Sequence, residues 1–355
     1  MSTPTQSTDP TPKASGPGSP LLRAPGAVAG EGLDAPVAAH YGDPLREQRL
    51  LAEGLAVVDL SHRPVLTVTG PDRLSWLHSL TTQMLLGLPA RESRETLVLS
   101  PKGHVEHDLH VVDDGETTWV TTEPGAAGPL LAWLDSMRFM LRVEVADVSH
   151  EHAVLGEPYA AESLPGEPLA WRDPWPDLVG ATGDTAAYGP LEGHPGTGRA
   201  WRELIVPRAD LVAAVGDRPL AGSWAAEALR IAAWRPRLGY ETDHRTLVHE
   251  VDWLRSAVHL HKGCYRGQET VARVHNLGRP PRRLVFLHLD GSGHLLPDRG
   301  SELTLDGRAV GFLTSVARHH EDGPIALALI KRNTPVDAVL VAGDVAGAQT
   351  VVVTP

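Results

Sequence analysis

Cysteine is almost absent from this sequence, since Cys264 is the single one among 355 residues. One thiol cannot form an internal disulfide, and it cannot supply the four thiolates that usually hold an iron–sulfur cluster. Whatever Cys264 does, it acts alone or together with another molecule. Any contact with a cluster would be transient or shared with a partner.

Long apolar runs are missing as well. No stretch of 18 or more consecutive apolar residues occurs, and residues 1–20 have neither the basic start nor the apolar core of a secretory signal. We therefore expect a cytoplasmic protein that does not contact a membrane.

Positive charge is scarce overall, with a formal net charge of −12 at pH 7. Because phosphate binding depends on clustered cations, this balance argues against a direct nucleic-acid partner. Residues 260–283 depart from it, with Glu269 as their single acid. The cations of this segment are Lys262, Arg266, Arg273, Arg279, Arg282 and Arg283. We expect the segment to attract anionic ligands.

The order of expected elements indicates an α+β fold. Residues 1–36 are rich in Pro, Gly, Ser, Thr and Ala without apolar periodicity, which predicts a disordered tail. Apolar spacing predicts helices over 71–85, 126–138 and 221–235, and strands over 96–100, 104–112 and 117–121. From residue 283 to 355, short strands separated by turn residues are typical of a small, closed or nearly closed β-barrel.

The octapeptide KGCYRGQE, residues 262–269, surrounds the cysteine. Gly263 and Gly267 permit a tight turn, and the residues that follow carry helix start and stop signals. The helix N-terminus, Lys262 and Arg266 would together favour the thiolate, so the pattern predicts a reactive cysteine. The sequence has only four lysines, which indicates that a compact ammonium is wanted at position 262. The residues leave one alternative open, in which Cys264 is a small buried core residue.

The strand pattern GHVEHDLHV, residues 103–111, raises the question of a metal site. His104, Glu106, Asp108 and His110 would share one face of a straight strand. Neighbouring ligands on such a face are about 7 Å apart, too far to reach one ion unless another element contributes. We therefore predict no metal site, and we expect this face to line solvent or a cavity.

The octapeptide resembles the signature of the YgfZ-type folate-binding proteins. These are relatives of the glycine-cleavage T-protein, an aminomethyltransferase, and include iron–sulfur assembly factors. The similarity runs from about His40 to Pro355. It includes VTGPDRLSWLHSLTTQ, EALRIAAWRPRLGYETDHRTLVHE and GRAVGFLTSVARHHEDGPIALALIKR.

The resemblance implies a T-protein-like folate-binding module of two subdomains over residues 37–260, then the signature turn and helix over 261–282. With the barrel, these units would form a ring around a central cavity for tetrahydrofolate or a one-carbon derivative, with Cys264 at its rim. The implied folate-binding residues are Asp108 and Arg230. The implied site of chemistry is the signature, namely Lys262, Gly263, Cys264, Tyr265, Arg266, Gly267, Gln268 and Glu269.

Two departures from the T-protein pattern bear on the activity. Arg199 stands where an acidic residue near the folate is expected, and His107 replaces the first acid of a pair that keeps Asp108. Aminomethyl transfer needs a carboxylate to orient the amine. These departures argue against that transfer as the activity, and we expect instead the role that the resemblance implies, an accessory factor for iron–sulfur enzymes, including those that modify tRNA, with iron–sulfur enzymes or assembly proteins as partners. The alternative is a folate-dependent aminomethyltransferase or demethylase.

Overall fold

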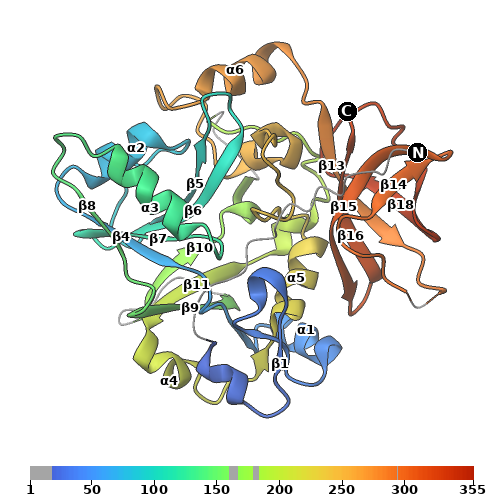
Figure 1. Cartoon of the computed structure of the whole chain (residues 1–355), viewed down its shortest axis with the longest axis horizontal. Helices are drawn as coiled ribbons and strands as arrows, with labels where there is room; N and C mark the ends of the chain where they lie inside the picture. Colours follow the sequence, from blue (N-terminus) through green and yellow to red (C-terminus); the bar gives the residue numbers. More distant parts are fainter. Residues whose placement is uncertain (1–17, 160–166, 179–183, 294) are drawn as a thin grey trace, which may run out of the picture.

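The structure, a computed structural model, describes residues 18–159, 167–178, 184–293 and 295–355. Two five-stranded sheets and a closed six-stranded barrel make up its three main units (Figure 1). Strands Val28–Ala29 (β1) and Ala38–His40 (β2) form a separate short ladder.

The first sheet is antiparallel throughout and carries helices α2 (Arg73–Leu80) and α3 (Ala127–Ser136). Leu77 of α2 and Leu130 of α3 are fully buried in the same cluster as Leu66 and Leu109 of the sheet. The strand order is β5 (Ser93–Leu99), β6 (Val105–Asp113), β7 (Thr117–Thr121), β4 (Val65–Thr69) and β8 (Glu144–Asp147). The apolar alternation of these strands thus buries one face of the sheet under the two helices.

The second sheet lies below the first in Figure 1 and is packed by α1 (Pro44–Ala52), α4 (Leu211–Val215) and α5 (Ser223–Ala232). Its order is β10 (Leu169–Arg172), β11 (Trp201–Pro207), β9 (His152–Pro158), β3 (Val57–Asp59) and β12 (Leu220–Ala221). The β12–β3 pair is parallel, and the other pairs are antiparallel.

The barrel closes in the order β13, β16, β15, β14, β17, β18. Its strands are β13 (Arg282–Leu289), β14 (Glu302–Leu305), β15 (Arg308–His319), β16 (Gly323–Lys331), β17 (Val339–Ala342) and β18 (Val345–Val351). Helix α6 (Gln268–Leu277) precedes it, and short 3₁₀ turns cover Pro20–Arg23, Gly32–Asp34, Trp175–Leu178, Pro195–Gly198, Arg208–Asp210, Val248–Val251 and Trp253–Arg255. The predicted α+β class and the predicted barrel are confirmed.

One apolar cluster joins the first sheet, helix α6 and the barrel. It contains Leu99 of β5, Val271 of α6, and Leu284 and Phe286 of β13, together with the buried Trp253. Because these side chains come from separate units, the first sheet, the signature helix and the barrel share a core.

Part of the segment predicted to be disordered is folded. Residues 1–17 lie outside the described residues, but residues 18–36 form two 3₁₀ turns and β1. Leu21 and Leu33 are 5% and 6% exposed, so the expectation of a disordered segment fails there. Isolated apolar residues in a Pro/Gly-rich segment can thus dock on an existing core, although they show no periodicity of their own.

Helix α2 also ends earlier than predicted, at Leu80 rather than residue 85. Thr81 is extended. The ammonium of Lys262, which lies far along the chain, caps this helix end by donating hydrogen bonds to the carbonyl oxygens of His78 and Thr81. A helix stop made by a distant residue leaves no local signal.

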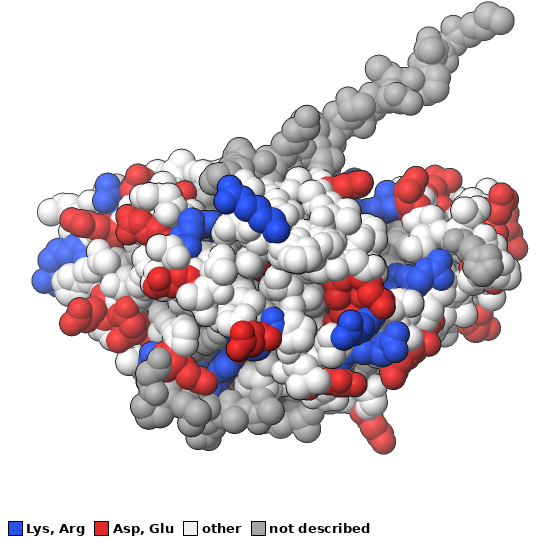
Figure 2. All heavy atoms as spheres, turned by 90° about the horizontal axis from the view of Figure 1, so that it is seen from below, with Lys and Arg blue, Asp and Glu red and all other residues white. Residues whose placement is uncertain are grey.

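No helix among the described residues combines the length and apolarity needed to cross a bilayer. The face shown in Figure 2 carries acidic and basic side chains interspersed with one another.

Candidate functional site

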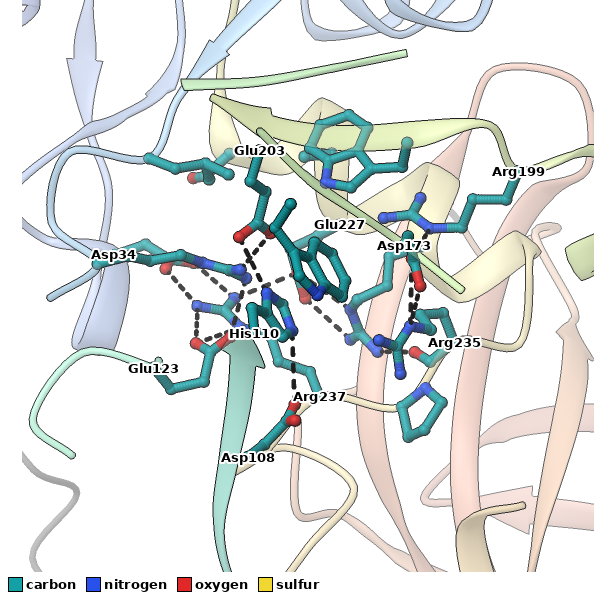
Figure 3. A pocket seen from close by; sticks show the side chains of 18 residues that line it. Asp34, Asp108, His110, Glu123, Asp173, Arg199, Glu203, Glu227, Arg235 and Arg237 are labelled. Carbon is teal, nitrogen blue, oxygen red and sulfur yellow. Dashed lines mark hydrogen bonds and ion pairs between the residues drawn. The ribbon is translucent and has the colours of Figure 1, made fainter. Parts of the chain in front are cut away.

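A charged cavity lies where the two sheets, α5 and the segment after α5 meet (Figure 3). Five arginines and six acidic residues line it, and most of their side chains are buried. The lining charged residues are Asp34, Arg63, Asp108, Glu123, Asp173, Arg199, Glu203, Glu227, Arg230, Arg235 and Arg237. Since unpaired buried charges are costly, their pairing determines what the cavity can bind.

Arg63 and Arg237 form the first set of pairs. Arg63 follows β3 and reaches Glu123 at 2.8 Å and Glu203 at 2.5 Å. Arg237 reaches Asp34 and Glu123, each at 2.8 Å. Burial alone would raise the pKa of Asp34, but Arg237 and His62 lower it well below its usual value. The Asp34 carboxylate is therefore ionised and held in place.

A second set of pairs lies at the opposite side of the cavity. Arg235 reaches Glu95 at 2.7 Å and Asp173 at 3.2 Å, and Arg199 also contacts Asp173, at 3.2 Å. Burial raises the pKa of Glu95 to about 7, although Arg235 opposes this shift. Arg199, the residue noted in the sequence at the place of an expected acid, thus lies in the cavity as a paired cation.

His110 of β6 connects the two sheets. Its Nδ1 lies 2.9 Å from Glu203 Oε2, its Nε2 lies 3.7 Å from Asp108 Oδ2, and its ring stacks on Trp171 with 3.6 Å between centroids. Burial opposes protonation, but Glu203 and Asp108 outweigh it and raise the pKa of His110 to about 10. The imidazole is therefore a cation at neutral pH.

Asp108 and Arg230, the two folate-binding residues implied by the resemblance, both line this cavity. Each side chain is about 95% buried, with 5% of the residue exposed. Arg230 of α5 reaches Glu227 and Glu241 at 2.9 Å and donates to Ser315 Oγ at 2.7 Å. Arg230 is therefore a buried, paired cation rather than a surface residue of its helix.

Three buried polar atoms in the cavity have no partner among the described residues: Asp108 Oδ1, Arg63 Nε and Arg235 Nη1. A ligand that offers N–H donors to a carboxylate and oxygen acceptors to a guanidinium would satisfy them. The aromatic faces of Trp171 and Trp201 also line the cavity. The open space is only about 50 Å³, room for about one or two waters, so a bicyclic ligand requires the side chains to rearrange.

The strand that suggested metal ligands is interrupted by a bulge. Val98 pairs with His107 and Leu99 with Val105, so Glu106 is left between them and points to solvent. The predicted single face of four ligands is therefore wrong, because the bulge reverses the alternation. Asp108 and His110 remain together on the cavity side.

Another strand does contribute a third possible metal ligand. Atoms of Glu95, Asp108 and His110 lie within 4.8 Å of one another. However, Glu95 accepts hydrogen bonds from Trp253 and Ser256 and pairs with Arg235, and His110 is bonded to Glu203. A cation there would have to displace an arginine.

The signature turn is positioned by its two ends. Lys262 binds the last carbonyl oxygens of α2, and burial lowers the pKa of its ammonium to about 8. Gly267 has φ +83°, and a Cβ there would lie 2.6 Å from Ser100 O in the β5–β6 turn. The turn is thus fixed against α2 at one end and against the β5–β6 turn at the other.

Cys264 is exposed, which excludes the alternative of a buried core cysteine. Gly263 has φ +92°, Tyr265 is 8% exposed, and Gln268 begins α6 and donates to Gly263 O at 2.8 Å. Arg266 pairs with Glu106 at 3.0 Å, and Glu269 lies in the first turn of α6. Both cations expected to act on the thiol therefore have other partners.

None of the eight signature residues lines the central cavity. The structure brings Asp108 and Arg230 together, and it places the signature turn separately on the outer side of the β5–β6 turn. The sequence reasoning missed Arg63, Glu203 and Arg237. Alternation along β11 gave a signal for Glu203, because Glu203 is a charged residue inside the apolar strand RELIVP.

Comparisons with known proteins agree with this architecture. The family model described as the GCVT N-terminal domain matches residues 21–156. Aminomethyltransferase T from Bartonella henselae has a similar structure, with a TM-score of 0.69 over 94% of this chain and 95% of that one, at 18% identity.

Curated relatives are distant in sequence. A chloroplastic protein of Arabidopsis thaliana, named as a putative transferase, is 27% identical over 79% of this chain. An aminomethyltransferase of Herpetosiphon aurantiacus is 28% identical over 80% of each chain. The match spans 66% of the Arabidopsis protein, just under two thirds of its length.

Proposed function

The chain is GcvT-like in its N-terminal domain and in its fold, and from this premise we propose that it binds a tetrahydrofolate species in the central cavity. We further propose that it serves as an accessory factor in the assembly or repair of iron–sulfur clusters, including those of tRNA-modifying enzymes. The cluster is cargo that a partner holds, since the chain has one thiol.

The donor set of the cavity supports a folate ligand. A pterin presents N–H donors beside ring acceptors, and Asp108 Oδ1, Arg63 Nε and Arg235 Nη1 are the complementary atoms without partners. Tetrahydrofolate would supply one-carbon chemistry when bound. The residues of this chain would bind and orient it. The side chains of Arg63 and Arg235 would have to move away from their carboxylate partners to make room for it.

The single observation that carries the accessory role is the exposure of Cys264 on a turn fixed at both ends. A structural cysteine of a globular protein is usually buried, whereas a thiol that contacts a partner must be accessible. Because the turn does not line the folate cavity, the two activities occupy separate surfaces and can be tested separately.

The test is Cys264→Ser in a strain that lacks the protein, with a cluster-dependent tRNA modification as the measurement. We expect the variant to fail to restore the modification while it binds tetrahydrofolate like the wild type, measured on the purified protein. Asp108→Asn serves as the matched variant, since it should lose folate affinity and keep the thiol. Full restoration by Cys264→Ser would remove the proposed role of the cysteine.

One observation favours the alternative, a folate-dependent aminomethyltransferase or demethylase. Although Arg199 replaces one expected acid, Glu203 and Asp108 both lie in the cavity and hold His110 between them. Purified protein incubated with tetrahydrofolate and an N-methylated amine would then move the methyl group to N5 of the folate and the N5 proton to the amine, a transfer that needs no oxidant. Turnover that Asp108→Asn abolishes would establish this alternative.

A further inference from the structure

A second cavity, of about 630 Å³, lies where the start of α3, the turn after β3 and the β8–β9 connection meet. Figure 1 shows β8 at the outer edge of the first sheet and α3 across the face of that sheet. Arg63 lines both this cavity and the central one, but the proposed folate and thiol sites do not use it otherwise.

The N-terminus of the ten-residue helix α3 opens into this cavity. Gly125, Ala127 and Gly128 line it, the N-cap residue Ala126 makes no side-chain cap, and the first turn has no acid. The first backbone N–H groups of a helix have no intrahelical partner and favour anions. A helix end alone does not establish a site.

A buried ring nitrogen without a partner provides an independent observation. The side chain of His62 is 1% exposed and lines the cavity, and its Nε2 lies 2.9 Å from Asp34 Oδ1. Within the described part of the chain, His62 Nδ1 is buried and has no hydrogen-bond partner. Burial of such atoms is costly unless a ligand satisfies them.

Arg208 adds a cation that forms no close ion pair within the described residues. Its guanidinium donates to Ser149 O and Ser61 O, each at 2.8 Å, and among the described residues no acidic oxygen lies within 4.0 Å. The lining carboxylate, Asp147, accepts from Ser149 N at 2.9 Å. Exposed His150, also at the rim, lies 3.3 Å from Glu151.

We propose that this second cavity binds a phosphate group, held by Arg208 and the first N–H groups of α3 and in reach of His62. A phosphate group carries both P–O acceptors and a P–O–H donor, so it can pair with His62 Nδ1 whether that nitrogen donates or accepts. The proposal does not depend on folate binding or on Cys264.

Gly128 provides a sharp test, because no atom lies within 4 Å of a Cβ added there and its φ is ordinary. Gly128→Asp places a carboxylate in the first helical turn, where it stabilises the helix but repels an anion. Gly128→Asn is the neutral control of the same shape. Calorimetric titration with inorganic phosphate should show about tenfold weaker binding for Gly128→Asp than for Gly128→Asn.

The same titration with glycerol 3-phosphate and acetate identifies the ligand class. Tighter binding of glycerol 3-phosphate than of inorganic phosphate would assign the site to a phosphorylated small molecule, and the reverse to free phosphate. Acetate binding as tightly as phosphate would overturn the proposal, as would no binding of millimolar phosphate or equal affinities of the Asp and Asn variants. Unchanged tetrahydrofolate affinity in both variants separates this result from the folate site.

Discussion

The protonation state of a residue in the central cavity depends on the charges that surround it. His110 is the clearest case, because its imidazole lies between Glu203 and Asp108 with Trp171 against its face. In water a histidine is half protonated near pH 6.5, whereas here its pKa is raised to about 10. The ring therefore acts as a permanent positive link between the two sheets at neutral pH.

This shift predicts a pH-dependent contribution to stability. The folded pKa of His110 is raised above the unfolded value, so its contribution is complete below about pH 6.5 and is lost as pH rises through about 10. Urea unfolding of the wild type and His110→Gln should show a stability difference that shrinks by on the order of a few kcal/mol between about pH 6 and pH 9. A nitrogen NMR titration in which the ring loses its proton below neutral pH would contradict the expectation.

Individual site residues were only partly predictable from the sequence. The family resemblance led to Asp108 and Arg230, and both reach the cavity. It could not give their partners, since Arg63 and Glu203 are separated by 140 residues and meet only through the packing of two sheets. Charge pairs formed across units leave no periodic pattern in the sequence.

At the level of elements, the signature turn depends on how closely it approaches the β5–β6 turn. Gly267 combines a left-handed backbone with a contact that leaves no room for a side chain. Gly263 shares the left-handed backbone, but nothing lies within 4 Å of its Cβ position. Substitutions at these two glycines therefore distinguish the energetic cost of backbone strain, present at both, from the cost of steric contact, present only at Gly267.

We expect Gly267→Ala to lower the free energy of unfolding by about 2–4 kcal/mol, from backbone strain plus overpacking. Gly263→Ala, the matched control, should cost about 1–2 kcal/mol from strain alone. Urea unfolding of both variants measures the difference. Equal costs would show that the contact with Ser100 O relaxes freely.

Element types were predicted more reliably than their ends. The strand over 117–121 and the helix over 126–138 were expected close to where β7 and α3 lie, because both have clear apolar spacing and end at turn residues. Helix α2 stops early because Lys262 satisfies its last carbonyl oxygens, and β6 contains a bulge that alternation cannot reveal. Tertiary contacts override the local pattern at these two places.

At the level of the whole molecule, α5 joins the two-sheet module to the barrel through buried charge. Arg230 of α5 donates to Ser315 of β15, and Glu241, which is fully buried, accepts from both Arg230 and Thr314. A charge removed from such a group leaves its partner buried and unpaired.

Arg230→Met should therefore lower the free energy of unfolding by about 3–5 kcal/mol. Arg138→Met removes a surface pair with Asp135, in which both side chains are more than 40% exposed, and should change stability by about 0.5 kcal/mol or less. Urea unfolding followed by tryptophan fluorescence compares the two variants. A loss for Arg230→Met as small as that for Arg138→Met would show that the barrel does not depend on this link.

The crowded state of the central cavity has a kinetic consequence. A molecule that enters must exchange carboxylate for ligand at one arginine after another, rather than simply displace solvent. The observed rate of association would then be limited by how often the ion pairs around Arg63 and Arg235 open. This rate would stop rising with ligand concentration once ligand molecules encounter the cavity more often than the ion pairs open. A plateau in the observed association rate at high ligand concentration, measured by stopped flow, would show that opening of these ion pairs limits binding.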